Sequence, residues 1–287
     1  LLGVEKIGRR RARFNKSGRQ MAPIQLQPLS SRQGAAVLLY CLVPMGLGFL
    51  IPLMVLVAPV VSDLSLWSDT GLWRAAAHSL ALGGASAGLV VTLATVMVLG
   101  LQKTPAAWKK SLLTLTTVGY AFPGAVLGLG ILIPLATFDN WLADLVFATF
   151  RRDPGLLLTG SAGALIVAYC VRFFAIGVGA AEAGLAAIST NIPLAASTLG
   201  RGPKDVLVNI YQPLMRGSLA TAMVLVFVDT VKELPATLLL RPFNFDTLST
   251  HVYAQASLEN FHGSTPAALL IITLSLGAIF LLAKAHR

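Results

Sequence analysis

The sequence is short of charged residues and of cysteine. Only 12% of its 287 residues are charged, whereas soluble domains average about 25%. With an apolar share of 55%, too little polar surface remains to solvate a compact globule, which argues strongly against a soluble protein. A disordered chain is excluded as well, because disorder requires high charge and few apolar residues. The two cysteines, Cys41 and Cys170, lie inside apolar runs and cannot form a disulfide scaffold.

Signals for enzyme chemistry are also missing. The sequence contains no Gly-x4-Gly-Lys-Ser/Thr phosphate loop, so this chain cannot supply a nucleotide site. His78, His251 and His262 show no metal-ligand spacing, and no Ser–His pair, His-Glu-x-x-His motif or aspartyl dyad occurs at a suitable depth. We therefore expect a protein that is not an enzyme and that holds neither a metal nor a cofactor in this chain.

Long apolar runs dominate what is present. A helix needs about 20 apolar residues to cross the hydrocarbon core of a bilayer. The sequence has six stretches that qualify or nearly do, at 35–61, 75–101, 111–137, 156–181, 217–240 and 265–283. The predicted fold class is all-α, a polytopic membrane bundle of six transmembrane helices. After the third stretch, residues 138–147 favour either a short surface helix or an ordinary loop anchored by Trp141.

The basic residues predict the orientation. The connections 1–34, 102–110, 182–216 and 284–287 hold sixteen Lys and Arg residues, whereas the other connections hold four, Arg74, Arg151, Arg152 and Arg241. Because cytoplasmic connections are enriched in Lys and Arg, we expect both termini in the cytoplasm. The sequence thus divides into a basic cytoplasmic linker, 1–34, near anionic lipid and a transmembrane domain, 35–287. No aromatic or motif pattern accompanies the net charge of +10, so we expect no nucleic-acid partner.

Charged residues also occur inside the fifth apolar stretch. Asp229, Lys232 and Glu233 have the spacing of one helix face, and Pro235 breaks the backbone hydrogen bonding just beyond them. Ionisable residues at membrane depth usually face a cavity, so these four residues are predicted to line a translocation path. The alternative is a structural ion pair between helices, for example with Arg172. Arg172 itself is expected near the inner face, where it can snorkel to lipid headgroups.

The connection before the fifth stretch is unusually long. Residues 193–199 are predicted to form a helix, Gly200–Pro203 a turn, and a second helix is expected to begin near Lys204 and to stop at Pro213. Two short helices at an angle would project into the cytoplasm as a rigid knob. A passive linker is the alternative.

This connection resembles the coupling-loop motif of ABC importer permeases, Glu-Ala-Ala-x3-Gly-x9-Ile-x-Leu-Pro. The matching residues are Ala195, Ala196, Gly200, Ile210 and Pro213, and the departures are Leu194 and Gln212. Residues 119–124, 171–174, 182–185 and 229–248 are similar to the ferric-iron type of these permeases. The resemblance covers nearly the whole chain and matches the C-terminal six-span half of that family. The basic opening resembles the linker between the two halves.

The resemblance implies a permease subunit of an ATP-driven, binding-protein-dependent importer in the bacterial inner membrane, with ferric iron as the first cargo. It implies separate ABC ATPase subunits, which would dock at Ala195, Ala196, Gly200, Arg201, Ile210 and Pro213. A periplasmic substrate-binding protein, a second six-span permease half and membrane lipid complete the expected partners. The carboxylate missing at Leu194 implies a weaker or rearranged contact with the ATPase.

Several alternatives stay open at this point. The same class of permease carries thiamine, sulfate or phosphonate. A different class, an ion-coupled secondary transporter, would use Asp229 and Glu233 as proton carriers and would need no ATPase. The chain, which begins at Leu1, is expected to be a segment of something longer, or a processed or incomplete product. The second half could lie on the same polypeptide, on a separate chain or on an identical copy.

Overall fold

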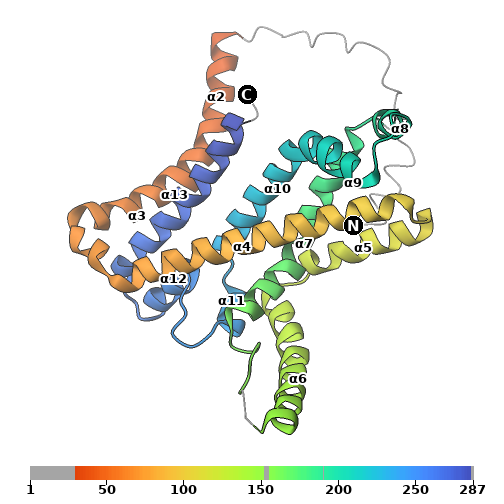
Figure 1. Ribbon diagram of the computed structural model, residues 1–287. Coiled ribbons are helices and arrows are strands. Elements are labelled where there is room, and N and C mark those ends of the chain that lie inside the picture. Colours follow the sequence, from red (N-terminus) through yellow and green to blue (C-terminus); the bar gives the residue numbers. More distant parts are fainter. Residues whose placement is uncertain (1–29, 152–154, 190, 286–287) are drawn as a thin grey trace. The chain divides into compact units, whose positions relative to one another are not determined.

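The computed structural model describes residues 30–151, 155–189 and 191–285, and within these ranges all regular structure is helical (Figure 1). Most of the predicted linker 1–34 lies outside the described residues. In this described part of the chain, six helical segments are long and apolar enough to cross a membrane, which confirms the all-α, six-span class. They are Ser31–Ser62, Thr70–Gly100, Gly124–Phe150, Ala162–Ala186, Lys204–Val231 and Phe261–Lys284. The chain divides into two compact units, Leu1–Pro52 and Leu53–Arg287.

The described part of the first unit is the beginning of the first span. Helix α2, Ser31–Met45, starts at a capping box in which Ser30 Oγ accepts from the Gln33 N–H and Gln33 Oε1 accepts from the Ser30 N–H. This cap satisfies two backbone donors at the helix start. A π turn, η1, Gly46–Leu50, then leads into α3, Ile51–Ser62. Since Pro52 follows directly and has no N–H, the π turn lies where the regular helical ladder loses a donor.

Three helices form the core of the second unit: α4, Thr70–Gly100, α7, Ala162–Ala186, and α10, Gln212–Val231 (Figure 1). Small residues allow them to pack closely. A Cβ added to Gly177 would lie only 2.9 Å from the Ala94 Cβ, so the backbones of α7 and α4 approach each other at this point. Buried apolar side chains such as Leu82, Leu165 and Val226 fill the remaining space.

The prediction of a third span at 111–137 was wrong. The structure has α5, Ala106–Ala121, and a separate α6, Gly124–Phe150, and only α6 is long and apolar enough to cross a membrane. Phe122 and Pro123 break the run, because a residue before proline favours extended backbone and Phe122 adopts it, with ψ of 142°. Helix α6 then continues through residues 138–150, which were expected in a connection, with no separate surface helix there.

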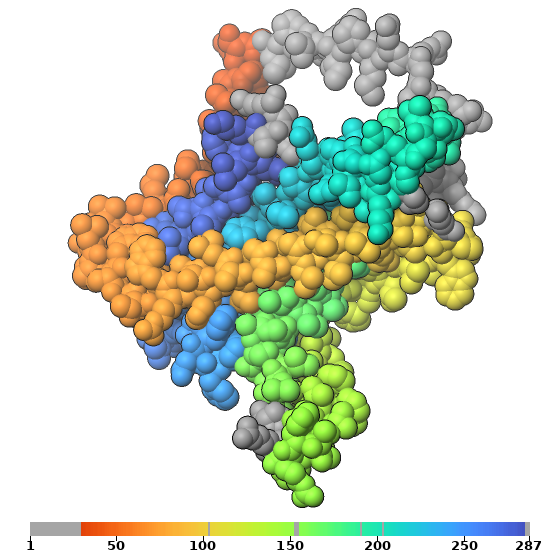
Figure 2. All heavy atoms as spheres, viewed as in Figure 1, coloured from red at the N-terminus to blue at the C-terminus, as the bar shows by residue number. Residues whose placement is uncertain are grey.

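A buried carboxylate fixes the chain after α6. Asp139 is fully buried, and its two oxygens accept hydrogen bonds from the backbone N–H groups of Leu157, Leu158 and Thr159 at 2.7–2.9 Å. Ser161 then caps α7. Figure 2 shows the C-terminal half of α6 (lime) extending away from the core helices. The carboxylate of Asp139 therefore ties this outlying helix to the segment that leads into α7.

The fifth apolar stretch is also divided, since α10 ends at Val231 and a short helix, α11, Pro235–Leu240, follows. The next connection contains α12, Leu248–Ser257, which the sequence did not predict, and α13, Phe261–Ala285, is the sixth span. Two short 3-10 turns, η2, Leu64–Ser68, and η3, Leu101–Lys103, flank α4.

Candidate functional site

The connection before the fifth span forms two helices at a turn, as predicted. Helix α8 spans Asn191–Thr198. The turn that follows contains Gly200, whose φ of +78° is a conformation that favours glycine. The Gly200 N–H donates to the Ser197 carbonyl and the Arg201 N–H donates to the Ala196 carbonyl. These two bonds make a Schellman motif, which satisfies carbonyls at the helix end. The glycine of the coupling motif is therefore required by the turn that it makes here.

The second helix does not stop at Pro213, which corrects the sequence prediction. Helix α9, Pro203–Val206, continues through a π turn, η4, Leu207–Tyr211, directly into α10. The Gln212 N–H bonds to the Leu207 carbonyl, five residues back. This wider turn comes immediately before Pro213. The helix therefore continues through Pro213, although proline has no N–H to donate. The knob is consequently a rigid extension of the fifth span.

The predicted coupling residues differ in exposure. Ala196 is buried together with Val206, whereas Ala195, Gly200, Arg201 and Pro213 are exposed and Ile210 is half-buried. Arg201 Nη1 pairs with Asp205 Oδ2 at 2.7 Å across the turn. Leu194 and Leu199 are 64% and 81% exposed, so the tip of the segment presents apolar side chains. Figure 2 shows this segment (teal) at one end of the second unit.

The break between α10 and α11 is fully structured. The Ser249 hydroxyl donates to the Val231 carbonyl at 3.2 Å and to the Glu233 carbonyl at 2.9 Å. The Thr237 hydroxyl also donates to the Glu233 carbonyl, at 2.7 Å. Pro235 opens α11, where its missing N–H costs no helical hydrogen bond. Side chains thus replace the backbone bonds that the break removes, as buried carbonyls require.

The charged residues of the fifth stretch separate into two ion pairs. Lys232 Nζ lies 2.8 Å from Asp229 Oδ1. The sequence predicted that Glu233 shares one helix face with Asp229 and Lys232. This prediction was wrong, because Glu233 lies beyond the end of α10. Its Oε2 lies 3.0 Å from Nε of Arg172 on α7, and the Glu233 side chain is only 7% exposed. The ion pair between helices that the sequence left as an alternative is therefore present.

Both pairs nevertheless line one polar pocket. Its volume is about 370 Å³, and its lining residues are Tyr120, Arg172, Phe173, Asp229, Lys232 and Glu233. Lys232 and Tyr120 are more than half exposed. The pocket brings together three of the four predicted path residues, and Pro235 opens the helix next to it.

The predicted position of Arg172 near the inner face was wrong. Because residues 155–161 are not helical, α7 begins at Ala162 and Arg172 lies ~15 Å along it, well inside the helix and away from its inner end. Its guanidinium contacts Glu233 and the Phe122 carbonyl instead of snorkelling to headgroups. Arg172 and Glu233 come from different apolar stretches, and the sequence had offered this ion pair as the alternative to a translocation path.

Three of the four segments that carry the ferric-type resemblance meet at this pocket. A Cβ on Gly119 would overlap the Val171 carbonyl of α7, and a Cβ on Gly124 would lie 2.5 Å from Glu233 Oε1. Glycine at both positions thus permits α5 and the start of α6 to approach the Arg172–Glu233 pair. Residues 119–124, 171–174 and 229–235, far apart in sequence, form one site.

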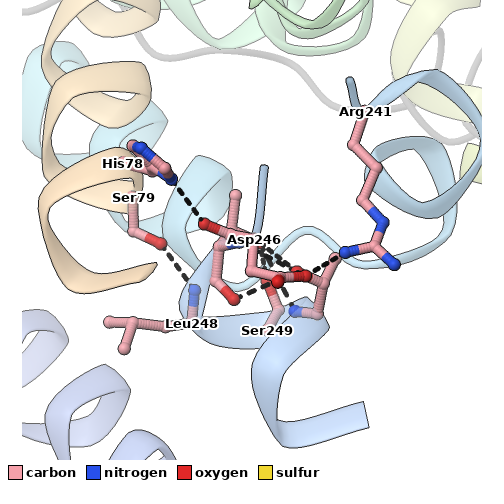
Figure 3. Close-up of polar contacts among 8 residues, drawn as sticks. His78, Ser79, Arg241, Asp246, Leu248 and Ser249 are labelled. Carbon is pink, nitrogen blue, oxygen red and sulfur yellow. Dashed lines mark hydrogen bonds and ion pairs between the residues drawn. The ribbon is translucent and has the colours of Figure 1, made fainter. Parts of the chain in front are cut away.

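A second polar cluster lies at the other end of α11 (Figure 3). His78 of α4 stacks on Phe245 with ring centroids 4.0 Å apart, and its Nδ1 lies 2.9 Å from the Asp246 carbonyl. Ser79 Oγ accepts from the Leu248 N–H, and Arg241 pairs with Asp246. These contacts anchor the 241–248 loop to α4. Among the described residues, no group of three or more His, Cys, Asp or Glu side chains could hold a metal ion.

Similar proteins of known sequence are transport permeases. No protein-family model matches the chain. It is 31% identical over 160 residues to the Fe(3+)-transport system permease protein FbpB 2 of Haemophilus influenzae. The aligned segment covers 56% of this chain and 29% of that protein. The matched segment therefore spans less than a third of that relative. A protein of Salmonella typhimurium named as the 2-aminoethylphosphonate transport system permease PhnV is 24% identical over 71% of each chain.

Solved structures agree on the fold. A chain of a bacterial alginate ABC transporter, crystallised with an alginate pentasaccharide-bound periplasmic protein, has a TM-score of 0.70 at 15% identity, covering 88% of this chain and 93% of that chain. A second structure of a bacterial ABC transporter that imports alginate gives 0.66 at 14% identity, over 88% and 96%. The described residues include six helices long and apolar enough to cross a membrane, and with these relatives they identify the chain as a multi-pass protein of the bacterial inner membrane.

Proposed function

We propose that this chain, which is similar to ABC importer permeases of the ferric-iron type, is the membrane subunit of an ATP-driven, binding-protein-dependent importer. The observation that carries the proposal is that the coupling-motif residues form a rigid two-helix knob, on a fold shared over 88% of the chain with an ABC transporter. ATP hydrolysis is assigned to separate ATPase subunits.

The knob formed by α8 and α9 is the proposed ATPase contact. Its helices are joined by the Gly200 turn, and Ala196 and Val206 are buried, while Leu194 and Leu199 remain exposed. Exposed apolar side chains on a rigid element are typical of a protein–protein interface. Since η4 joins the knob to α10 without interruption, a displacement of the knob would be transmitted to the helix that ends at the polar pocket.

The polar pocket is the proposed lining of the translocation path. Charged side chains at membrane depth must be paired or hydrated, and here the pairs Arg172–Glu233 and Asp229–Lys232 border an open volume of about 370 Å³. We expect Glu233→Ala and Glu233→Gln to reduce uptake more than membrane abundance. Lost abundance, or full uptake by both variants, would contradict this role.

The proposed cargo is ferric iron, and a phosphonate is the second candidate. The ferric-iron relative has the higher identity, whereas the phosphonate relative matches over more of its own length. A periplasmic binding protein and a second six-span half, together with surrounding lipid, complete the proposed assembly. The secondary-transporter alternative is weakened, because it leaves the knob formed by α8 and α9 without a role.

Cross-linking tests the ATPase contact. Cysteines placed at Ser197 and Arg201, both exposed, should cross-link to the ATPase subunit in inner-membrane vesicles. A cysteine at the exposed Leu258, in the connection on the other side of the membrane, is the matched control and should not. Labelling of Ser197→Cys and Arg201→Cys only from the periplasm would refute the proposal.

A further inference from the structure

One side chain contacts both helix breaks of the second unit. Arg172 Nη1 donates a hydrogen bond to the Phe122 carbonyl at 3.0 Å, at the break between α5 and α6. Its Nε lies 3.0 Å from Glu233 Oε2, at the break between α10 and α11. The two breaks are more than 100 positions apart in the sequence, yet a single guanidinium joins them.

Each break offers Arg172 an acceptor, which is the Phe122 carbonyl at the first break and the Glu233 carboxylate at the second. The first backbone bond of α6 runs from the Leu127 N–H to the Pro123 carbonyl, so the Phe122 carbonyl lies before the helical ladder and is available to a side chain. The Glu233 carboxylate is held from another side as well, since its Oε1 accepts a hydrogen bond from the Ala236 N–H at 3.4 Å. The backbone carbonyl of Glu233 accepts from Ser249 and Thr237. The carboxylate that pairs with Arg172 is therefore also bound to the first turn of α11.

The helices that follow the two breaks, α6 and α11, also contact each other. A Cβ added to Gly128 of α6 would lie 3.1 Å from Leu239 Cδ1 and 3.5 Å from the Ala236 Cα of α11. At this spacing the backbones of α6 and α11 are close-packed. Arg172 contacts the chain at the break that precedes each of these two helices.

We propose that Arg172 is a positioning residue that sets the angle of α6 and α11 together relative to α7, and thereby the shape of the polar pocket. The guanidinium is suited to this task, because its planar fork of five donors can serve two acceptors at once, whereas a lysine ammonium is a compact point charge on a flexible stem. The proposal rests on the proposed function in one respect, namely that the pocket lines the transport path.

Spin labels test the positioning directly. In the full transporter in lipid nanodiscs, with Cys41 and Cys170 replaced by alanine, nitroxides at the exposed Ile133 of α6 and Val167 of α7 report the α6–α7 distance. Labels at Leu89 of α4 and Val167 form the control pair. We expect Arg172→Lys to broaden the distance distribution of the first pair about twofold and to leave the control pair unchanged. Unchanged distributions in both pairs, or equal broadening in both, would overturn the proposal.

A neutral double variant separates positioning from charge balance. Arg172→Gln combined with Glu233→Gln leaves no unpaired charge, so normal abundance is expected. If Arg172 positions both breaks, the Ile133–Val167 distribution broadens in this variant although no charge is left unpaired. A distribution like that of the wild type would show that the pair only balances charge. Should the wild-type complex show no ATP-dependent uptake, the proposed function fails, while the spin-label comparison still decides the role of Arg172.

Discussion

Gly124 and Glu233 are in such close contact that no side chain fits between them. A Cβ on Gly124 would lie 2.5 Å from Glu233 Oε1 and 3.2 Å from Arg172 Nη1. The first residue of α6 thus packs directly against the Arg172–Glu233 pair, although it carries no functional group.

Gly124→Ala is therefore expected to displace the Glu233 carboxylate from Arg172. We predict a strong loss of ATP-dependent uptake, with overpacking strain of about 1–3 kcal/mol and membrane abundance reduced less than uptake. Gly130→Ala on the same helix is the matched control, because a Cβ at Gly130 meets nothing within 4 Å. Similar uptake by the two variants would show that the close contact has no consequence for transport.

Gly177 tests the packing of α7 on α4. A Cβ at this position would lie 2.9 Å from both Ala94 Cβ and Val90 Cγ1. We predict that Gly177→Ala lowers the stability of the purified protein by about 1–3 kcal/mol, measured as a lower midpoint of thermal unfolding in detergent. Gly179→Ala, where a Cβ meets nothing within 4 Å, should unfold like the wild type. If both variants unfold at the same temperature, the helices are less closely packed than described.

Gly200 tests the turn between α8 and α9. Because its φ is +78°, Gly200→Ala should strain the turn by about 1 kcal/mol and weaken the contact with the ATPase subunit. The expected result is less ATPase co-purified with the permease and weaker stimulation of ATP hydrolysis. Gly202→Ala is the control, since its φ lies outside the left-handed region and a Cβ there meets open space. Equal co-purification would argue against a defined turn.

Asp139 tests the anchoring of the segment before α7. Its carboxylate accepts three backbone N–H groups, and the amide of Asp139→Asn offers only one acceptor oxygen. A cost of about 1–3 kcal/mol is expected for the unsatisfied groups. Hydrogen exchange of residues 157–159 should become faster, whereas the exposed Asp144→Asn on the same helix should leave it unchanged. Unchanged exchange in Asp139→Asn would contradict the anchoring role.

Hydropathy and local turn chemistry predicted much of the fold. Five of the six spans follow from apolar runs, and the turn at Gly200 follows from glycine and proline, since both signals are local. The third span was misplaced, because the apolar run continues across Pro123 and its composition does not reveal that Phe122 adopts extended backbone. The sequence also did not predict that the helix continues through Pro213. A π turn directly before this proline allows the helix to continue without the Pro213 N–H.

The site was only partly predictable. The spacing of Asp229, Lys232 and Glu233 drew attention to the right segment, but the partners of Glu233 depend on how α7 and α5 pack against it. The three N–H groups bound by Asp139 lie 18 to 20 residues further along the chain, and no local pattern marks such a pairing. Tertiary packing, and not the sequence of either segment, selects these contacts.

The proposed import function can be tested by uptake in a reconstituted transporter. Proteoliposomes that hold this chain together with the proposed second half and ATPase subunits, with ATP inside and the loaded binding protein outside, should accumulate radiolabelled iron(III). Accumulation should require both the ATPase and the binding protein, and it should be lost in Glu233→Ala at normal abundance. Accumulation that proceeds without the ATPase and follows an imposed proton gradient would contradict the account.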